Sequence, residues 1–291
     1  MITLAIVLAV FVGVSLGLLG GGGSILTVPL LAYVAGMDAK QAIATSLLVV
    51  GTTSAVGAIS HARAGRVQWR TALLFGATTM AGAYAGGHLA KFIPGTVLLI
   101  GFAVMMVVTA IAMLRGRKNT ATTAHTQQLP LAKIAVVGVT VGMVTGLIGA
   151  GGGFLLVPAL VLLGGLPMPI AVGTSLVIIA MNSVAGLLGY LSSVRIDWTL
   201  GAALTAAAVA GALIGARFAG KVNPDALRKA FGWLVLGMAS VILGEEIHPA
   251  VGITVAALTA IAGAMTFACN HYAACPLRRL THRSTPTAAA T

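Results

Sequence analysis

The chain has 291 residues, of which 58% are hydrophobic and only 8% are charged, and its mean hydropathy is +1.04. A water-exposed surface normally needs about a quarter of its residues charged, so this composition excludes a soluble globular domain and favours membrane-spanning helices. Lys and Arg total 17 against five Asp and Glu, an excess that indicates cytoplasmic loops and anionic lipid rather than nucleic acid. We predict an all-α, multi-pass integral protein of the cell (inner) membrane.

The first membrane unit is predicted over residues 1–114. Its first apolar run, 2–19, lacks the basic start and cleavage site of a signal peptide and is predicted to be the first span. A Gly break, Gly20–Gly23, separates this run from a short helix expected over 25–36. Longer apolar runs then predict helices over 40–60, 71–92 and 95–114.

The rest of the chain divides by the same criteria. Residues 115–130 are polar, Thr-rich and basic, and predict an exposed linker. A second membrane unit follows over 131–244, with helices expected over 131–148, 154–164, 168–192, 199–219 and 226–244. A further apolar run, 249–275, is predicted to be an extra transmembrane segment, and 276–291 a basic tail.

The two units repeat one pattern 129 residues apart. The segment Gly17 to Pro29, GLLGGGGSILTVP, returns from Gly146 to Pro158 as GLIGAGGGFLLVP. Chance similarity between apolar segments would not also align rare Trp and Arg residues in the same register, so we predict two tandem homologous repeats. The register continues without a gap through Thr45 and Thr174, Ser46 and Ser175, Ser54 and Ser183, Arg66 and Arg195, and Trp69 and Trp198.

Positive charge predicts how the repeats are oriented. The basic loops 61–70 and 115–130 should be cytoplasmic. If the short helix adds a pass, each unit crosses the membrane an odd number of times. The basic loop 217–229 and the tail then also lie inside, with Glu245 and Glu246 outside. We therefore predict inverted repeats with a cytoplasmic C-terminus.

The short helices suggest where a solute binds. Eleven or twelve residues rise only ~16 to 18 Å and cannot cross a ~30 Å hydrocarbon core. A Gly-rich turn before such a half-helix presents backbone N–H groups and the positive end of a helix dipole, which suits an anion, although glycines that only permit close helix packing are the alternative. The predicted donors are the backbone amides of Gly22, Gly23, Ser24, Gly151, Gly152 and Gly153.

Neutral side chains and entrance residues complete the predicted site. Hydroxyls on the helix after each break can donate hydrogen bonds without fixing a buried charge, and the buried amide of Asn182 must pair with a neighbouring helix or with substrate. The hydroxyls are those of Thr45, Ser46, Thr174 and Ser175. Two matched loops should concentrate anions at the entrances through Arg66, Trp69, Arg195 and Trp198.

The doubled motif points to a family. GLLGGGGS followed by VPLL, and GLIGAGGG followed by VPAL, each with a TSL-containing helix after it, resemble the TauE/SafE sulfite exporter family, the TSUP family of membrane permeases. The likeness covers about residues 4–244, whereas the run 249–275 departs from the usual pattern. The resemblance implies a secondary transporter of small sulfur-containing anions such as sulfite or organosulfonates.

Alternatives remain at this stage. A metal-cation carrier would need buried carboxylate, His or Cys ligands, which are scarce in the paired helices. A non-transport membrane accessory protein of sulfur metabolism is the other alternative. We predict no catalytic residue, no cofactor and no metal site. The coupling ion, proton or sodium, and the oligomeric state stay open.

Overall fold

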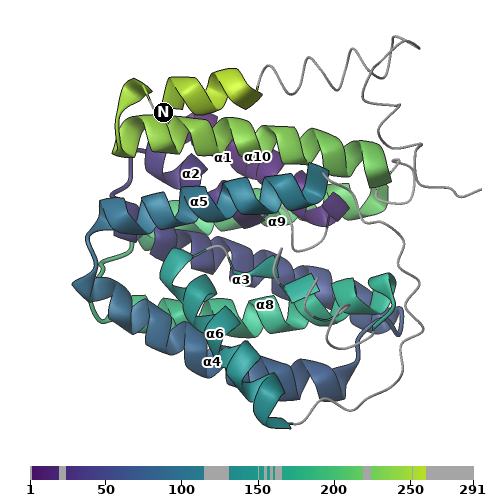
Figure 1. Ribbon diagram of the computed structural model, residues 1–291. Helices are drawn as coiled ribbons and strands as arrows, with labels where there is room; N and C mark the ends of the chain where they lie inside the picture. Colours follow the sequence, from purple (N-terminus) through teal and green to yellow (C-terminus); the bar gives the residue numbers. More distant parts are fainter. Residues whose placement is uncertain are drawn as a thin grey trace, which may run out of the picture.

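The computed structural model describes residues 2–19, 24–114, 131–149, 151–153, 156–157, 160, 166–218, 224–250 and 252–259. Every regular element in this part of the chain is helical, as the composition predicts (Figure 1). The first unit contains α1 Ile2–Leu19, α2 Thr27–Pro29, η2 Leu30–Val34, α3 Ala39–Arg63, α4 Trp69–Leu89, η3 Ala90–Phe92 and α5 Gly95–Leu114. The second contains α6 Leu131–Ile148, α8 Met168–Leu191, α9 Trp198–Phe218 and α10 Pro224–Glu246.

The expected short helix of the first unit is present, but its helix type changes along its length. A single turn of 3₁₀-helix at residues 24–26 leads into α2, and the segment then widens into the π-helix η2, which follows Pro29. Proline removes a backbone donor and disturbs the regular α-helical ladder, which accounts for the change at this position. Most of the matching segment, 154–164, lies outside the described residues.

Helices from the two units pack against each other throughout the bundle. In Figure 1, α3 and α8 occupy the centre, α5 lies beside α10 on one side, and α4 lies beside α6 on the other. The first helix, α1, packs along α9. Leu47 meets Gly186, and Leu176 meets Gly57, so α3 and α8 run antiparallel.

Glycines bring these helices into backbone contact. A Cβ at Gly142 on α6 would collide with the carbonyl oxygen of Thr79 on α4, and a Cβ at Gly13 on α1 would collide with that of Ala208 on α9. Such small residues allow close packing where lipid supplies no hydrophobic driving force. The two contacts match across the units: Gly142 lies 129 positions after Gly13, and Ala208 lies 129 positions after Thr79.

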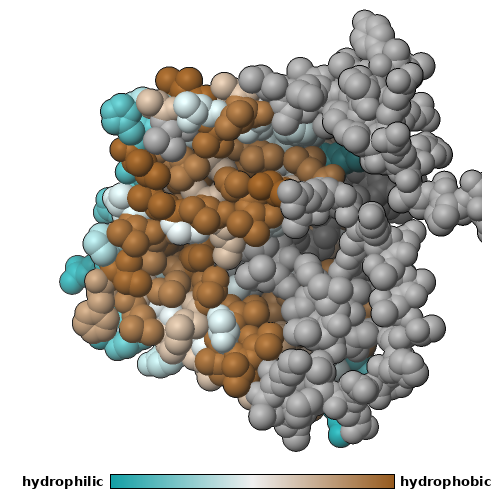
Figure 2. Space-filling view, viewed as in Figure 1, coloured by the Kyte–Doolittle hydropathy of each residue, from teal (hydrophilic) through white to brown (hydrophobic). Residues whose placement is uncertain are grey.

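The outer surface of the bundle is apolar. Leu73 and Leu74 on α4 and Val104 and Val108 on α5 are at least half exposed. Figure 2 shows hydrophobic residues across this face and hydrophilic ones gathered at its left margin, where helices end. Among the described residues, three helices are long and apolar enough to cross a membrane by themselves, namely Ala39–Arg63, Pro169–Leu191 and Trp198–Phe218. An exposed apolar band on an all-helical bundle is the surface of a membrane protein.

The segment after α10 folds back onto that helix. Helical residues 252–259 follow a turn at Ile247, and Gly252 packs against Gly244 and the carbonyl oxygen of Ser240. Ile253 and Leu258 are exposed. Residues 260–275 of the predicted extra segment, the linker 115–130 and the tail 276–291 lie outside the described residues.

Candidate functional site

The Gly break of the second unit is wedged between the two central helices. Gly149, Gly151 and Gly152 have φ values of +75°, +63° and +76°, a left-handed conformation that glycine adopts readily and other residues do not. A Cβ on Gly151 would lie 2.6 Å from Cγ1 of Val50 on α3 and 3.0 Å from Cγ2 of Ile179 on α8. Both backbone conformation and lack of space therefore require glycine at position 151.

One of the four predicted hydroxyls reaches this break. The Oγ of Ser46 donates to the carbonyl oxygen of Gly149 at 2.6 Å and lies 2.7 Å from that of Ile43 in its own helix. The hydroxyl thus joins α3 of the first unit to the break of the second. Gly153 is buried in the same turn. In the first unit, Gly22 and Gly23 lie outside the described residues, and Ser24 is fully buried.

The other predicted hydroxyl residues are buried, and two of them make hydrogen bonds elsewhere. Oγ1 of Thr174 accepts a hydrogen bond of 3.0 Å from the backbone N–H of Gln68, which ties α8 to the loop before α4. Oγ of Ser175 donates to the carbonyl oxygen of Val172 in its own helix. Thr45 is 1% exposed. The structure therefore brings Ser46, but not Thr174, to the break of the second unit.

Three buried polar side chains in the central helices have no hydrogen-bond partner. Both Nδ2 and Oδ1 of Asn182 are unpaired, as are the hydroxyls of Ser54 and Ser183. Each of the three residues is at most 1% exposed. An unpaired buried polar group costs about 1 to 3 kcal/mol, so a cluster of them marks a place for a ligand or water. We call Ser54, Asn182 and Ser183 the polar centre.

The polar centre lies beside the Gly break. Oγ of Ser183 is 3.3 Å from the position of a Cβ on Gly151, and Cβ of Ser183 faces Gly51 on α3. Because α3 and α8 run antiparallel, the observed contacts place Ser54 within about one helical turn of Asn182 along the bundle axis. Asn182 was predicted from the sequence and the two serines were not, although Ser54 and Ser183 occupy matching positions in the two units.

A third unpaired hydroxyl lies beside a small cavity. Oγ1 of Thr27, in the short helix of the first unit, is buried without a partner. The cavity beside it has a volume of about 10 Å³ and is lined by α1, α3 and α9 residues that include Ala9, Val49 and Leu204. It is about large enough for one water molecule.

The two predicted entrances lie at opposite ends of the bundle. Arg66 follows the C-terminus of α3, and its carbonyl oxygen packs against Gly173. The carbonyl oxygen of Arg195 instead accepts a hydrogen bond of 3.4 Å from Gln41, near the N-terminus of α3. Trp69 and Trp198 are the exposed first residues of α4 and α9. We refer to these ends as the Arg66 end and the Arg195 end.

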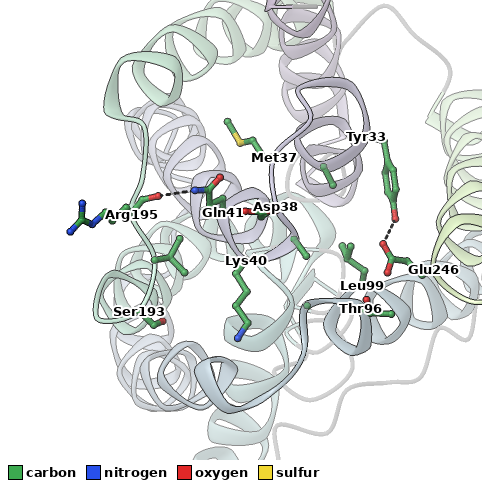
Figure 3. Close-up of a pocket in the computed structure, with 14 residues that line it drawn as sticks. Tyr33, Met37, Asp38, Lys40, Gln41, Thr96, Leu99, Ser193, Arg195 and Glu246 are labelled. Atoms are coloured by element: carbon green, nitrogen blue, oxygen red, sulfur yellow. Dashed lines mark hydrogen bonds between the residues drawn. The ribbon is translucent and has the colours of Figure 1, made fainter.

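A cavity of about 660 Å³ opens at the Arg195 end. Its walls come from both units: the short helix and the starts of α3 and α5 from the first, and residues 193–195 and Glu246 from the second. Figure 3 shows the Arg195 guanidinium directed away from the other lining residues. Lys40 also lines the cavity, and its Nζ donates to the carbonyl oxygen of Lys91 at 3.1 Å. Lys40 is a cation at this cavity that was not predicted from the sequence.

The charged side chains described in α3 and α9 stand near the ends of these helices. In α3, His61 and Arg63 stand in the last turn and Lys40 in the first. In α9, Arg217 stands in the last turn. Within the part of the chain that the structure describes, no group of three or more His, Cys, Asp or Glu could hold a metal ion. The polar groups at the centre are thus neutral.

An all-helical membrane protein with a Gly-broken helix and neutral polar groups buried beside the break has the architecture of a membrane carrier. The chain belongs to the family described as sulfite exporter TauE/SafE, whose pattern matches residues 5–242. This confirms the family indicated by the doubled glycine motif. The family is one of membrane transporters, not of enzymes.

Relatives carry similarly general names. A "Probable membrane transporter protein" of Xylella fastidiosa is 35% identical over 236 residues, which cover 78% of this chain and 89% of the relative. The "Probable membrane transporter protein YdhB" of Bacillus subtilis is 28% identical over 242 residues, 82% of this chain and 98% of the relative. No solved structure matches the chain.

Proposed function

We propose that the chain is a secondary transporter of small sulfur-containing anions, such as sulfite or organosulfonates, and that it binds its substrate between two inverted repeats at the Gly breaks. The observation that carries the proposal is the polar centre: buried hydroxyl and amide groups without partners, beside Gly151, which packs closely between α3 and α8. Neutral donors can select an anion and still release it. The protein is a multi-pass component of the cell (inner) membrane.

Repeated contacts support the inverted arrangement. Gly142 meets Thr79, and the residues 129 positions away from each, Gly13 and Ala208, make the equivalent contact. Because α8 is the repeat equivalent of α3 and lies antiparallel to it, a pseudo-two-fold axis passes between the two helices in the membrane plane. Rocking of one repeat against the other would expose the polar centre alternately to each side.

The charge distribution supports an orientation. At the Arg66 end, the described charged residues include Arg63, Arg70 and Arg217, whereas the Arg195 end carries Asp38, Asp197, Glu245 and Glu246 beside its own cations. Since cytoplasmic loops are enriched in Lys and Arg, we place the Arg66 end in the cytoplasm. The 660 Å³ cavity then faces outside and serves as the outer access route.

The neutral centre argues against the two alternatives. A cation carrier would need carboxylate, imidazole or thiolate ligands for a desolvated metal ion, and Ser54, Asn182 and Ser183 supply none. An accessory protein that used its helices only as scaffold would have no reason to leave buried polar groups unpaired, because apolar residues there would be more stable.

The experiment is uptake of radiolabelled sulfite or methanesulfonate by vesicles containing the purified protein. Ser54→Ala and Ser183→Ala should each lower the rate at least about tenfold while leaving the melting temperature unchanged or raised, because each removes an unpaired hydroxyl. Thr52→Val is the matched control, since Thr52 is exposed and bonds only within its own helix. Normal transport by both serine variants would remove the polar centre from the site.

A further inference from the structure

The polar centre receives no charged group from the protein. Building on the proposed function, we propose that the transported species is the singly charged, protonated form of a titratable oxyanion, hydrogensulfite rather than sulfite in the case of a sulfur oxyacid. The proton then crosses the membrane on the substrate itself. Transport under this scheme needs no titratable side chain at mid-membrane.

The elements packed around the centre place their titratable groups far from it. Seven residues separate Ser54 from His61 on α3, and seven separate Ser183 from Tyr190 on α8, which is about 10 Å along a helix. Tyr190 is in addition bonded to the carbonyl oxygen of Leu147 at 2.6 Å. The other ionisable groups described on these elements stand nearer to the helix ends: Tyr33 on η2, Lys40 and Arg63 on α3, Arg70, Tyr84 and His88 on α4, and Arg217 on α9.

The Gly breaks carry no charge. Neither Gly20–Gly23 nor residues 149–153 contain an ionisable side chain. An anion at the centre therefore meets hydroxyls and an amide, and its charge is not cancelled by a partner. Arg and Lys at the two ends of the bundle act only on its approach.

The cost of removing an ion from water rises with the square of its charge. A dianion pays about four times the Born penalty of a monoanion of the same size, and even a monoanion pays several kcal/mol in a site without a counter-charge. Each hydrogen bond from a neutral donor stabilises a buried anion far less than a counter-charge would. The centre thus discriminates strongly against a doubly charged form.

The amide of Asn182 gives a second reason to expect a protonated substrate. Its amide presents an unpaired donor, Nδ2, and an unpaired acceptor, Oδ1. A fully deprotonated oxyanion has only acceptors, so it would satisfy Nδ2 and leave Oδ1 buried without a partner. The O–H of a protonated oxyanion can donate to Oδ1 while its other oxygens accept from Nδ2 and the serine hydroxyls. The two unpaired atoms of Asn182 therefore match a ligand that both donates and accepts.

The test measures initial uptake into vesicles with equal pH on both sides, from about pH 6 to about pH 9. The probes are sulfite, which titrates near neutral pH, methanesulfonate, a monoanion throughout, and sulfate, a dianion throughout. Below saturation, sulfite uptake should fall about tenfold per pH unit above its own pKa, while methanesulfonate uptake stays constant and sulfate is not carried. Vesicles with Gly151→Leu measure passive leakage.

The other outcomes contradict either this inference or the proposed function, and they can be told apart. Sulfite uptake that does not fall with pH, or sulfate carried as fast as methanesulfonate, would overturn the inference and leave the proposed function intact. Parallel loss of sulfite and methanesulfonate uptake would show that a protein group titrates, and would also overturn it. Failure to carry any of the three anions would overturn the proposed function itself.

A substitution tests the role of Asn182. Asn182→Leu removes donor and acceptor together and should slow hydrogensulfite about tenfold more than methanesulfonate, which has no O–H to donate to Oδ1. Equal slowing of the two anions would contradict the assignment of Oδ1 as acceptor of the substrate proton. Val184→Leu, at an exposed position two residues along α8, is the matched control.

Discussion

The hydroxyl of Tyr33 donates a hydrogen bond of 3.1 Å to Oε1 of Glu246, 213 residues further along the chain. Tyr33 lies at the end of the short helix of the first unit, and Glu246 is the last residue of α10 in the second. The bond forms in the wall of the cavity at the Arg195 end (Figure 3). It therefore ties the two units together on the face that we place outside.

Breaking this bond should make the outer end open more readily. A hydrogen bond of this kind contributes about 0.5 to 1.5 kcal/mol, so Tyr33→Phe should raise the accessibility of the cavity about two- to tenfold. The measurement is the labelling rate of Thr96→Cys by a membrane-impermeant maleimide, with Cys269 and Cys275 replaced by Ser. Tyr84→Phe, at an exposed tyrosine on α4, is the control. Equal labelling rates in the two variants would show that the bond does not limit opening.

Glycine at position 151 should be needed for both folding geometry and transport. Gly151→Leu forces a side chain into a left-handed backbone position and against Val50 and Ile179, so we expect loss of sulfite or sulfonate uptake and a lower melting temperature. Gly237→Ala on α10 meets no neighbour and should be neutral or stabilise the helix by about 0.5 to 1 kcal/mol. Normal uptake by the Gly151 variant would mean that the substrate lies elsewhere.

The helices could be predicted from the sequence because the responsible signals are local. Apolar runs of fixed length, interrupted by Gly or Pro, are visible without any tertiary information, and the observed helices begin and end close to the predicted positions. Gly149, Gly151 and Gly152 do occupy a sharp turn that glycine favours. The doubled motif that contains them was sufficient to indicate the family.

The site was less predictable because it depends on which helices meet. Nothing local shows that the N–H of Gln68 bonds the Thr174 hydroxyl, or that Asn182 and Ser54 lack partners. Lys40 and Glu246 reach one cavity only because the starts of α3 and α5 lie beside the end of α10. Side-chain direction was equally hidden: the Arg195 guanidinium points away from the cavity that its backbone lines (Figure 3).

Lys40 should recruit anions from the outer side. Lys40→Gln should raise the apparent KM for anion supplied at the Arg195 end, most at low ionic strength, because salt screens the attraction of exposed charges. Arg66→Gln should act in the same way only on anion supplied at the Arg66 end. Vesicles in which the protein is inserted in one or the other orientation distinguish anion supplied at the Arg195 end from anion supplied at the Arg66 end. A larger effect of Arg195→Gln than of Lys40→Gln on the outer side would contradict the assignment.

The paired glycine contacts should be equally sensitive in the two units. Gly13→Val and Gly142→Val each drive a branched side chain into the backbone of the neighbouring helix, at Ala208 and Thr79 respectively. Overpacking of this kind costs about 1 to 3 kcal/mol, and the proposed equivalence of the repeats predicts similar decreases in melting temperature in detergent. Gly101→Val, which meets no neighbour, should cost much less. A large drop for one variant alone would argue against equivalent packing in the two repeats.

Truncation should separate the extra C-terminal segment from the carrier. The segment after α10 has no counterpart in the first unit, and its described helical residues pack through Gly252 on Ser240 and Gly244. A chain that ends at Ile247 keeps Glu246 and its bond to Tyr33, so it should insert and transport at a rate close to that of the full chain. A chain that ends at Gly244 loses that bond as well and should show the faster cavity labelling expected for Tyr33→Phe. Loss of transport in the longer truncated chain, despite normal insertion, would make the extra segment part of the transport mechanism.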